Sequence, residues 1–209
     1  MEPLQRIKKN NQYYDLFFEK VKSRTDQRNY SYLLDRFLCL MPVKTGIIDI
    51  GCGTGEHLDY FSSNHYPCTG IEPSKKSREH CISKGLNVIE GSFETIKEDC
   101  KTFEHTIGGV WCAATLLHVP IEDFEKTIRD LFDILEKDGV LFFTVRLGNK
   151  AKWDKYDDET TNVERFIQLY EENFLEKTLN SVGFVTSLKL IEDSYWGRPS
   201  KWISMILTK

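Results

Sequence analysis

The stretch Ile47-Ile48-Asp49-Ile50-Gly51-Cys52-Gly53-Thr54-Gly55-Glu56 decides the fold. A short apolar run passes into a turn that has glycine at every second position, and polar residues then begin a predicted helix. A strand, a tight turn and a helix in this order direct backbone N–H groups and the positive end of the helix dipole at a ligand. Glycine lets that ligand approach the backbone closely, because no Cβ atom stands in the way. We therefore expect a ligand with a nucleoside part to bind here.

Short apolar segments alternate with helical patterns along the rest of the chain, which is typical of a parallel α/β sheet. The last two expected strands follow each other without a helix between them, so one strand at this end should run antiparallel. The sequence thus predicts a doubly wound, mostly parallel sheet. Its expected strands cover residues 46–50, 68–72, 85–90, 106–113, 140–145, 184–191 and 202–207.

Residues 1–42 come before the first expected strand and are predicted to form an N-terminal helical cap. Apolar residues recur at helical spacing over 14–21 and again over 33–40, with polar residues between the two runs. We therefore expect a pair of helices, which either close a ligand site or simply cover one edge of the sheet.

Two further segments interrupt the alternation of strands and helices. Residues 147–168 are polar and charged without a clear period, and residues 193–200 connect the last two expected strands. Long irregular segments in compact domains often act as lids or binding loops. We expect both segments to form a lid or substrate loops on a single domain that comprises residues 1–209.

The composition is that of an ordinary globular protein. The chain has 209 residues, of which 40% are hydrophobic and 29% charged, and its net charge of −4 argues against a nucleic-acid partner. Its first residues lack the apolar core of a signal peptide and no apolar run has membrane-spanning length, which predicts a cytoplasmic protein without a membrane partner. The six cysteines are scattered, so we expect reduced thiols and no metal site.

The spacing of the glycines narrows the choice of ligand. The dinucleotide-binding fingerprint has glycine at its first, third and sixth positions, but counting from Gly51 the sixth position is Glu56. A carboxylate there would repel a pyrophosphate, which argues against a nicotinamide dehydrogenase. The phosphate-loop pattern is absent too, because no Gly-Lys-Ser/Thr follows. With Glu72 ending the second expected strand, the pattern fits a nucleoside ligand without phosphate, such as S-adenosylmethionine.

The same residues resemble those of a known family. Residues 49–55 look like motif I of the class I S-adenosylmethionine-dependent methyltransferases, and residues 70–74 resemble the acidic end of that family's second strand. Residues 111–120 are similar to the segment after strand four in a small-molecule branch, the group around the tellurite-resistance methyltransferases. Residues 135–141 resemble the start of strand five. The resemblance spans residues 10–209 and implies a Rossmann-like, seven-stranded sheet with an antiparallel C-terminal strand.

This resemblance implies a set of residues for S-adenosylmethionine. Gly51 and Gly53 would approach the methionine tail and the ribose, Asp49 would orient the ammonium group, and Glu72 would accept hydrogen bonds from the ribose hydroxyls. For Glu72 the alternative is a solvated acid at a strand end. Ser92 replaces the family's usual adenine-binding acid. The remaining expected cofactor-binding residues are Tyr14, Cys52, Gly55, Pro73, Phe93 and Cys112, the last as a small buried thiol under the cofactor rather than a nucleophile.

The sequence contains fewer signals for the methyl acceptor than for the cofactor. A general base is needed only if the acceptor must lose a proton, and His118 after the fourth expected strand is our candidate, with a structural histidine as the alternative. Arg146, at the carboxyl end of the fifth expected strand, and Arg198 would pair with an acidic group of the acceptor. The expected substrate-binding residues are Trp111, His118, Arg146, Trp153, Trp196 and Arg198.

We therefore expect an S-adenosylmethionine-dependent methyltransferase that acts on a small molecule by in-line displacement. A methyltransferase acting on tRNA or protein is the nearest alternative. A non-catalytic S-adenosylmethionine-binding partner subunit or sensor is an alternative of a different class.

Overall fold

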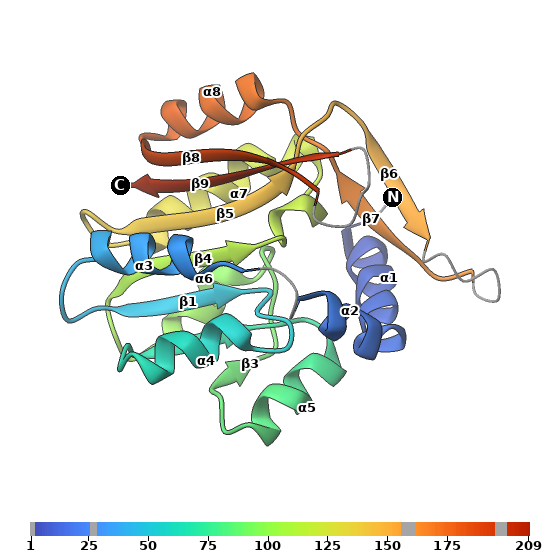
Figure 1. Ribbon diagram of the computed structural model, residues 1–209, viewed down its shortest axis with the longest axis horizontal. Helices are drawn as coiled ribbons and strands as arrows, with labels where there is room; N and C mark the ends of the chain where they lie inside the picture. Colours follow the sequence, from blue (N-terminus) through green and yellow to red (C-terminus); the bar gives the residue numbers. More distant parts are fainter. Residues whose placement is uncertain (1–2, 26–28, 156–161, 195–199) are drawn as a thin grey trace.

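The computed structural model describes residues 3–25, 29–155, 162–194 and 200–209. Figure 1 shows a central sheet with helices on both of its faces. Within the described ranges this sheet has seven strands in the order β3-β2-β1-β4-β5-β9-β8. The strands are β1 Gly46–Ile50, β2 Cys68–Ile71, β3 Val88–Ile89, β4 Ile107–Ala113, β5 Val140–Arg146, β8 Val185–Asp193 and β9 Lys201–Thr208.

The strand directions confirm the predicted sheet. The pairs β1–β2, β1–β4, β2–β3 and β4–β5 are parallel. Strand β9 runs antiparallel to both of its neighbours, β5 and β8. The third strand is shorter than the expected 85–90, because Gly85 has a φ of 77° and belongs to the turn that follows a helix.

Helices close both faces of the sheet. On one face, α3 (Ser31–Leu40) and α4 (Glu56–Ser63) cover a core that contains Trp111 and Phe142. On the other face, α7 (Ile121–Ile134) and α8 (Glu172–Val182) cover a core that contains Cys112. Neighbouring residues of β4 therefore point into different cores, as the alternation of side chains along a strand requires. The short elements α5, α6, η1 and η2 span Lys75–Ser83, Ile96–Asp99, Cys100–Thr102 and Leu116–His118.

The N-terminal residues form three helices in the described ranges rather than the expected pair. Helices α1 (Pro3–Leu16) and α2 (Phe18–Thr25) come before α3. Figure 1 shows α1 and α2 beyond the carboxyl ends of β1 and β4, whereas α3 lies on the face of the sheet. The N-terminal segment therefore contributes two helices to the end of the sheet where ligands bind in open α/β folds, and one helix to the core.

Residues 147–168, expected to form a lid or substrate loop, contain two strands in their described part instead of irregular structure alone. Strands β6 (Ala151–Lys155) and β7 (Glu164–Gln168) pair antiparallel and make a separate two-stranded sheet. Helix α1 packs against β7, so this pair of strands is held by α1 as well as by its own hydrogen bonds. Charged residues occupy three of the five positions of β6 and two of the five positions of β7, and neither strand shows the usual alternation of apolar and polar residues throughout.

None of the helices in the described ranges is long and apolar enough to cross a membrane.

We predict that Trp111→Ala lowers the free energy of unfolding by about 3–5 kcal/mol, as expected for removal of a large aromatic side chain from a core. Trp111 has no exposed surface, and its ring stacks on Phe142 with the centroids 3.7 Å apart. Urea denaturation followed by circular dichroism measures the change. Trp153→Ala is the matched control, because Trp153 is only half-buried. Equal losses in the two variants would contradict this assignment of Trp111 to the core.

Candidate functional site

A cavity of about 480 Å³ lies at the carboxyl ends of the parallel strands. Its walls come from the glycine turn after β1, the end of β2, the segment after β4, the end of β5, helix α1 and strand β7. The cavity has the size of a small-molecule site. It also lies where the strand order reverses between β1 and β4, the usual ligand position in an open α/β sheet.

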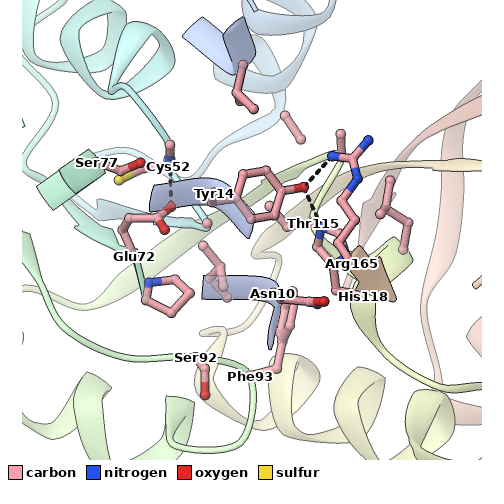
Figure 2. A pocket seen from close by; sticks show the side chains of 18 of the residues that line it. Asn10, Tyr14, Cys52, Glu72, Ser77, Ser92, Phe93, Thr115, His118 and Arg165 are labelled. Atoms are coloured by element: carbon pink, nitrogen blue, oxygen red, sulfur yellow. Dashed lines mark hydrogen bonds between the residues drawn. The ribbon is translucent and has the colours of Figure 1, made fainter. Parts of the chain in front are cut away.

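The glycine turn is tied to the end of β2 by one carboxylate. The backbone N–H of Gly53 donates to Glu72 Oε2 over 2.9 Å, and the N–H of Ser74 donates to Glu72 Oε1 over 2.7 Å. Figure 2 shows the first of these bonds at one side of the cavity. Each carboxylate oxygen accepts about two hydrogen bonds. Glu72 therefore keeps acceptor capacity for a ligand with paired hydroxyl groups.

Burial raises the pKa of Glu72 to about 7, although the two N–H donors and Arg78 favour the ionised form. The residue is 6% exposed. At neutral pH the carboxyl group is thus balanced between its protonated and ionised forms. A ligand that donates hydrogen bonds to the carboxylate would shift this balance towards the ionised form.

The three glycines of the turn differ in the space that surrounds them. A Cβ at Gly53 would meet no atom within 4 Å, so this position is open to a ligand. A Cβ at Gly51 would lie 2.2 Å from Thr115 Cγ2, and one at Gly55 would lie 2.6 Å from a methyl carbon of Leu86. Packing within the protein therefore requires glycine at these two positions. Gly51 still lines the cavity, whereas Gly55 lies outside the lining formed by the described residues.

Asp49 is a buried carboxyl group close to the same turn. It is 1% exposed, and its Oδ2 atom has no hydrogen-bond partner among the described residues. Burial raises its pKa well above the usual value, and the nearby Cys81, Glu72 and Glu56 add to this effect. Such a group can be stabilised by a cationic ligand group or by a proton.

The other expected cofactor-binding residues divide into two groups. Tyr14, Cys52, Pro73, Ser92 and Phe93 line the cavity. Cys112, by contrast, has no exposed surface and belongs to the core between the sheet and α7. Its side chain points away from the cavity because it follows Trp111 and precedes Ala113 on one strand, and Ala113 lines the cavity.

The opposite side of the cavity carries a hydrogen-bonded group of Tyr14, His118 and Arg165 (Figure 2). Tyr14 Oη lies 2.7 Å from His118 Nε2, and Arg165 Nη1 donates to Tyr14 Oη over 2.8 Å. His118 Nδ1 lies 2.7 Å from the carbonyl oxygen of Phe166. Since a carbonyl can only accept, His118 carries its proton on Nδ1, and Nε2 accepts the hydrogen bond from the Tyr14 hydroxyl.

The surroundings keep the imidazole of His118 neutral. Burial, together with the charges of Arg165, Arg146 and Arg6, lowers its pKa to about 3 against the opposing effect of the hydrogen bond to Phe166. The lone pair of Nε2 is already used by Tyr14. Both residues line the cavity, and in this arrangement His118 holds the Tyr14 hydroxyl in place.

The expected substrate-binding residues fall into three groups: those that line the cavity, those outside its lining and those outside the described residues. His118 and Arg146 line the cavity. Trp111 lies in the core against Phe142, and Trp153 lies on β6 with Lys9 Nζ 4.6 Å from its ring centroid, so both are outside the cavity lining of the described residues. Trp196 and Arg198 fall outside the described residues.

Several residues that line the cavity were not expected from the sequence. Three of them, Arg6, Arg165 and Trp202, are cationic or aromatic residues that the pattern gave no reason to select, and His57 contacts the rings of Tyr30 and Trp111. Arg165 could have been placed at the cavity from the sequence only if residues 151–155 and 164–168 had been recognised as paired strands. The unexpected lining residues include Arg6, Asn10, His57, Arg165 and Trp202.

The described residues contain no group of three or more His, Cys, Asp or Glu side chains that could hold a metal ion.

Comparison with known proteins identifies a family. A family model described as a methyltransferase domain matches residues 23–187, which is most of the chain. A protein of Methanocaldococcus jannaschii described as uncharacterized is 26% identical over 144 residues, which are 68% of this chain and 53% of that protein. The chain thus spans about half the length of this curated relative.

Solved structures share the fold at low sequence identity. The 1,6-didemethyltoxoflavin N1-methyltransferase of Burkholderia thailandensis, solved with 1,6-didemethyltoxoflavin and S-adenosylhomocysteine, has a TM-score of 0.71 at 13% identity. The match covers 100% of this chain and 91% of that one. The magnesium protoporphyrin IX methyltransferase of Synechocystis, solved with S-adenosylhomocysteine, has a TM-score of 0.67 at 13% identity and covers 95% and 97%. The chain therefore belongs to the methyltransferase-domain family, and its fold is that of the class I S-adenosylmethionine-dependent methyltransferases.

Proposed function

We propose that this protein transfers a methyl group from S-adenosylmethionine to a small molecule. The observation that supports this most is that one cavity joins two differently built ends. One end has the open Gly53 backbone and the buried Glu72 carboxylate, and the other has the hydrogen-bonded hydroxyl of Tyr14. A cofactor and an acceptor can therefore lie next to each other and out of bulk water.

The residues at the Glu72 end fit the chemical groups of the cofactor. Glu72 has acceptor capacity for the two ribose hydroxyls, and Asp49 is a buried carboxyl group that an ammonium group would stabilise. Phe93 and Pro73 offer apolar surface for an adenine. When bound, S-adenosylmethionine supplies an electrophilic methyl group on a sulfonium. The two solved relatives were both determined with S-adenosylhomocysteine, the demethylated product, bound.

The residues at the Tyr14 end orient the acceptor. Tyr14 Oη donates to His118 and accepts from Arg165, which fixes the direction of its remaining lone pair. That lone pair can accept a hydrogen bond from a hydroxyl or amino group of the acceptor. Alignment of this group for in-line displacement and exclusion of water would provide much of the rate enhancement. We therefore assign His118 a positioning role through Tyr14, in place of direct proton abstraction.

The experiment that tests the proposal has two steps. Calorimetric titration with S-adenosylmethionine and S-adenosylhomocysteine should show one site per chain for each compound. Incubation with S-adenosylmethionine labelled in its methyl group and a small-molecule metabolite extract should then yield a labelled product. Label in added tRNA or protein alone would favour the macromolecular alternative, and binding without transfer to any of these would favour a sensor. Absence of binding would contradict the whole proposal.

We predict that the affinity for S-adenosylhomocysteine rises with pH up to about 7 and then levels off. Burial raises the pKa of Glu72 to about 7. Since the ribose hydroxyls donate to the ionised carboxylate, binding releases a proton below that pH and gains strength as the pH rises. Glu72→Gln should abolish this step and weaken binding by about 10-fold to 150-fold, the value of hydrogen bonds to a charged group.

Isothermal titration calorimetry between pH 5.5 and about pH 8.5 checks this prediction. Glu79→Gln serves as the control, because Glu79 is an exposed carboxylate on α5. A pH step that persists in the Glu72→Gln protein, or affinity like that of the wild type, would show that Glu72 does not bind the ribose.

We predict that His118 stays neutral, with its proton on Nδ1, from about pH 8 down to about pH 5. Its pKa is lowered to about 3, so that an ordinary titration near 6.5 should be absent. Nitrogen-15 NMR of the imidazole rings measures this, and the signals lost in His118→Gln identify the residue. A midpoint near 6.5 would restore His118 as a candidate general base, whose removal should then cost on the order of 10²-fold in rate.

A further inference from the structure

We infer that Asp15 on α1 is a positioning residue for the cofactor, which holds the Glu72 carboxylate in place through Ser74 and the N-terminus of α5. This inference rests on the proposed function, because that function assigns Glu72 to the cofactor. It is carried by a continuous chain of hydrogen bonds, by the cap on α5 and by the charge that Asp15 places near Glu72.

Asp15 connects the N-terminal helix to the segment after β2. Its Oδ1 atom accepts hydrogen bonds from the hydroxyl of Ser74 over 2.6 Å and from the backbone N–H of Lys76 over 3.0 Å. Helix α1 packs against α5, and the ring centroid of Phe18, the first residue of α2, lies 5.4 Å from that of His80 on α5. Asp15 therefore makes its hydrogen bonds between helices that pack against each other.

Ser74 passes this contact on to Glu72. It is 1% exposed, and its backbone N–H donates to Glu72 Oε1 over 2.7 Å. Its side-chain oxygen accepts from the N–H of Ser77 over 3.3 Å as the N-cap of α5. Because the hydroxyl has one proton, its donation to Asp15 leaves the lone pairs available to donors such as Ser77. One buried residue thus joins the carboxylate of Glu72 to α5 and to α1.

The N-terminus of α5 adds an electrostatic reason for this arrangement. Lys76 is the second residue of α5, so its N–H is one of the donors that a helix leaves without an intrahelical partner. A carboxylate at this end is favoured both by hydrogen bonding and by the helix dipole. Asp15 supplies that carboxylate from another helix. Without it, the first turn of α5 and the adjoining backbone would be held less tightly.

The position of α5 matters because the same helix holds the backbone at Glu72. Arg78 Nη1 donates to the carbonyl oxygens of Glu72 and Pro73 over 2.9 and 2.8 Å. A shift of α5 would therefore reach Glu72 through Arg78 as well as through Ser74. Such a shift would weaken binding to the carboxylate, since hydrogen bonds depend steeply on distance and angle.

Asp15 also acts on Glu72 through its charge. Burial and the negative charge of Asp15 raise the pKa of Glu72, while the two backbone donors and Arg78 lower it. Asp15 thus has two opposing effects on the cofactor site: its hydrogen bonds hold Glu72 in place, and its charge disfavours the ionised form of Glu72. Asparagine at position 15 would keep an acceptor oxygen without the charge, so the two effects can be separated.

Isothermal titration calorimetry with S-adenosylhomocysteine between about pH 5.5 and about pH 8.5 tests the inference. Asp15→Ala should weaken binding by about 10-fold at about pH 8, as expected for the loss of a hydrogen bond to a charged group. Asp15→Asn should stay within about 3-fold of the wild type at that pH, because it retains the acceptor. Its pH step should move to lower pH, since the charge that disfavours ionisation of Glu72 is gone. Asp133→Asn is the control, because Asp133 is an exposed carboxylate on α7 that pairs with Lys97.

A double-mutant cycle shows whether Asp15 acts through Glu72. In a Glu72→Ala protein, the added Asp15→Ala change should weaken binding by less than about 3-fold, because the group that Asp15 positions is gone. Equal factors in the two backgrounds would overturn the inference. So would a lower melting temperature of Asp15→Ala with unchanged affinity, which is the result expected of a purely structural cap. If Glu72→Ala does not fold, the pH step of Asp15→Asn decides, and a step at the wild-type position would overturn the inference.

These results are distinguishable from a failure of the proposed function. Wild-type protein that does not bind S-adenosylhomocysteine would contradict the proposed function, and the inference with it. Wild-type binding with the expected pH step, together with Asp15 variants that behave like the wild type, would overturn the inference alone.

Discussion

The pair of hydrogen bonds that Glu72 accepts from the N–H groups of Gly53 and Ser74 is the interaction on which the site depends. It joins the turn after β1 to the residues after β2, and so fixes the two neighbouring loops that form one end of the cavity. A buried carboxylate is costly, and these donors only partly offset the cost, because the pKa of Glu72 remains raised. The Glu72 carboxylate is therefore held in place by the protein and can still accept further hydrogen bonds from a ligand.

Acidic and basic side chains lie in different parts of the cavity's surroundings. A second buried carboxyl group, Asp49, lies near Glu72 without lining the cavity, while Arg146 and Arg165 line the cavity and act on the neutral ring of His118. These acidic and basic side chains lie on β1, just after β2, at the end of β5 and on β7.

The sequence was sufficient to predict the main elements of the sheet. The glycine turn, the strand at Gly46–Ile50 and the antiparallel end of the sheet follow from local patterns, because each pattern is set by neighbouring residues. The residues around the acceptor end of the cavity were harder to predict from the sequence. A parallel strand is buried on both faces, so the pattern around Trp111 does not reveal which face meets the ligand. Arg165 reaches the cavity through β7, which packs on α1 from the other end of the chain, and such a long-range contact has no local signal.

A crystal structure of the complex with S-adenosylhomocysteine is the most direct test of the central claim that Glu72 organises the cofactor site. The account predicts that both ribose hydroxyls lie within hydrogen-bond distance of the Glu72 carboxylate, that the bonds from Gly53 and Ser74 persist, and that the sulfur faces Tyr14. A ribose bound elsewhere, with Glu72 contacting only Gly53 and Ser74, would contradict it.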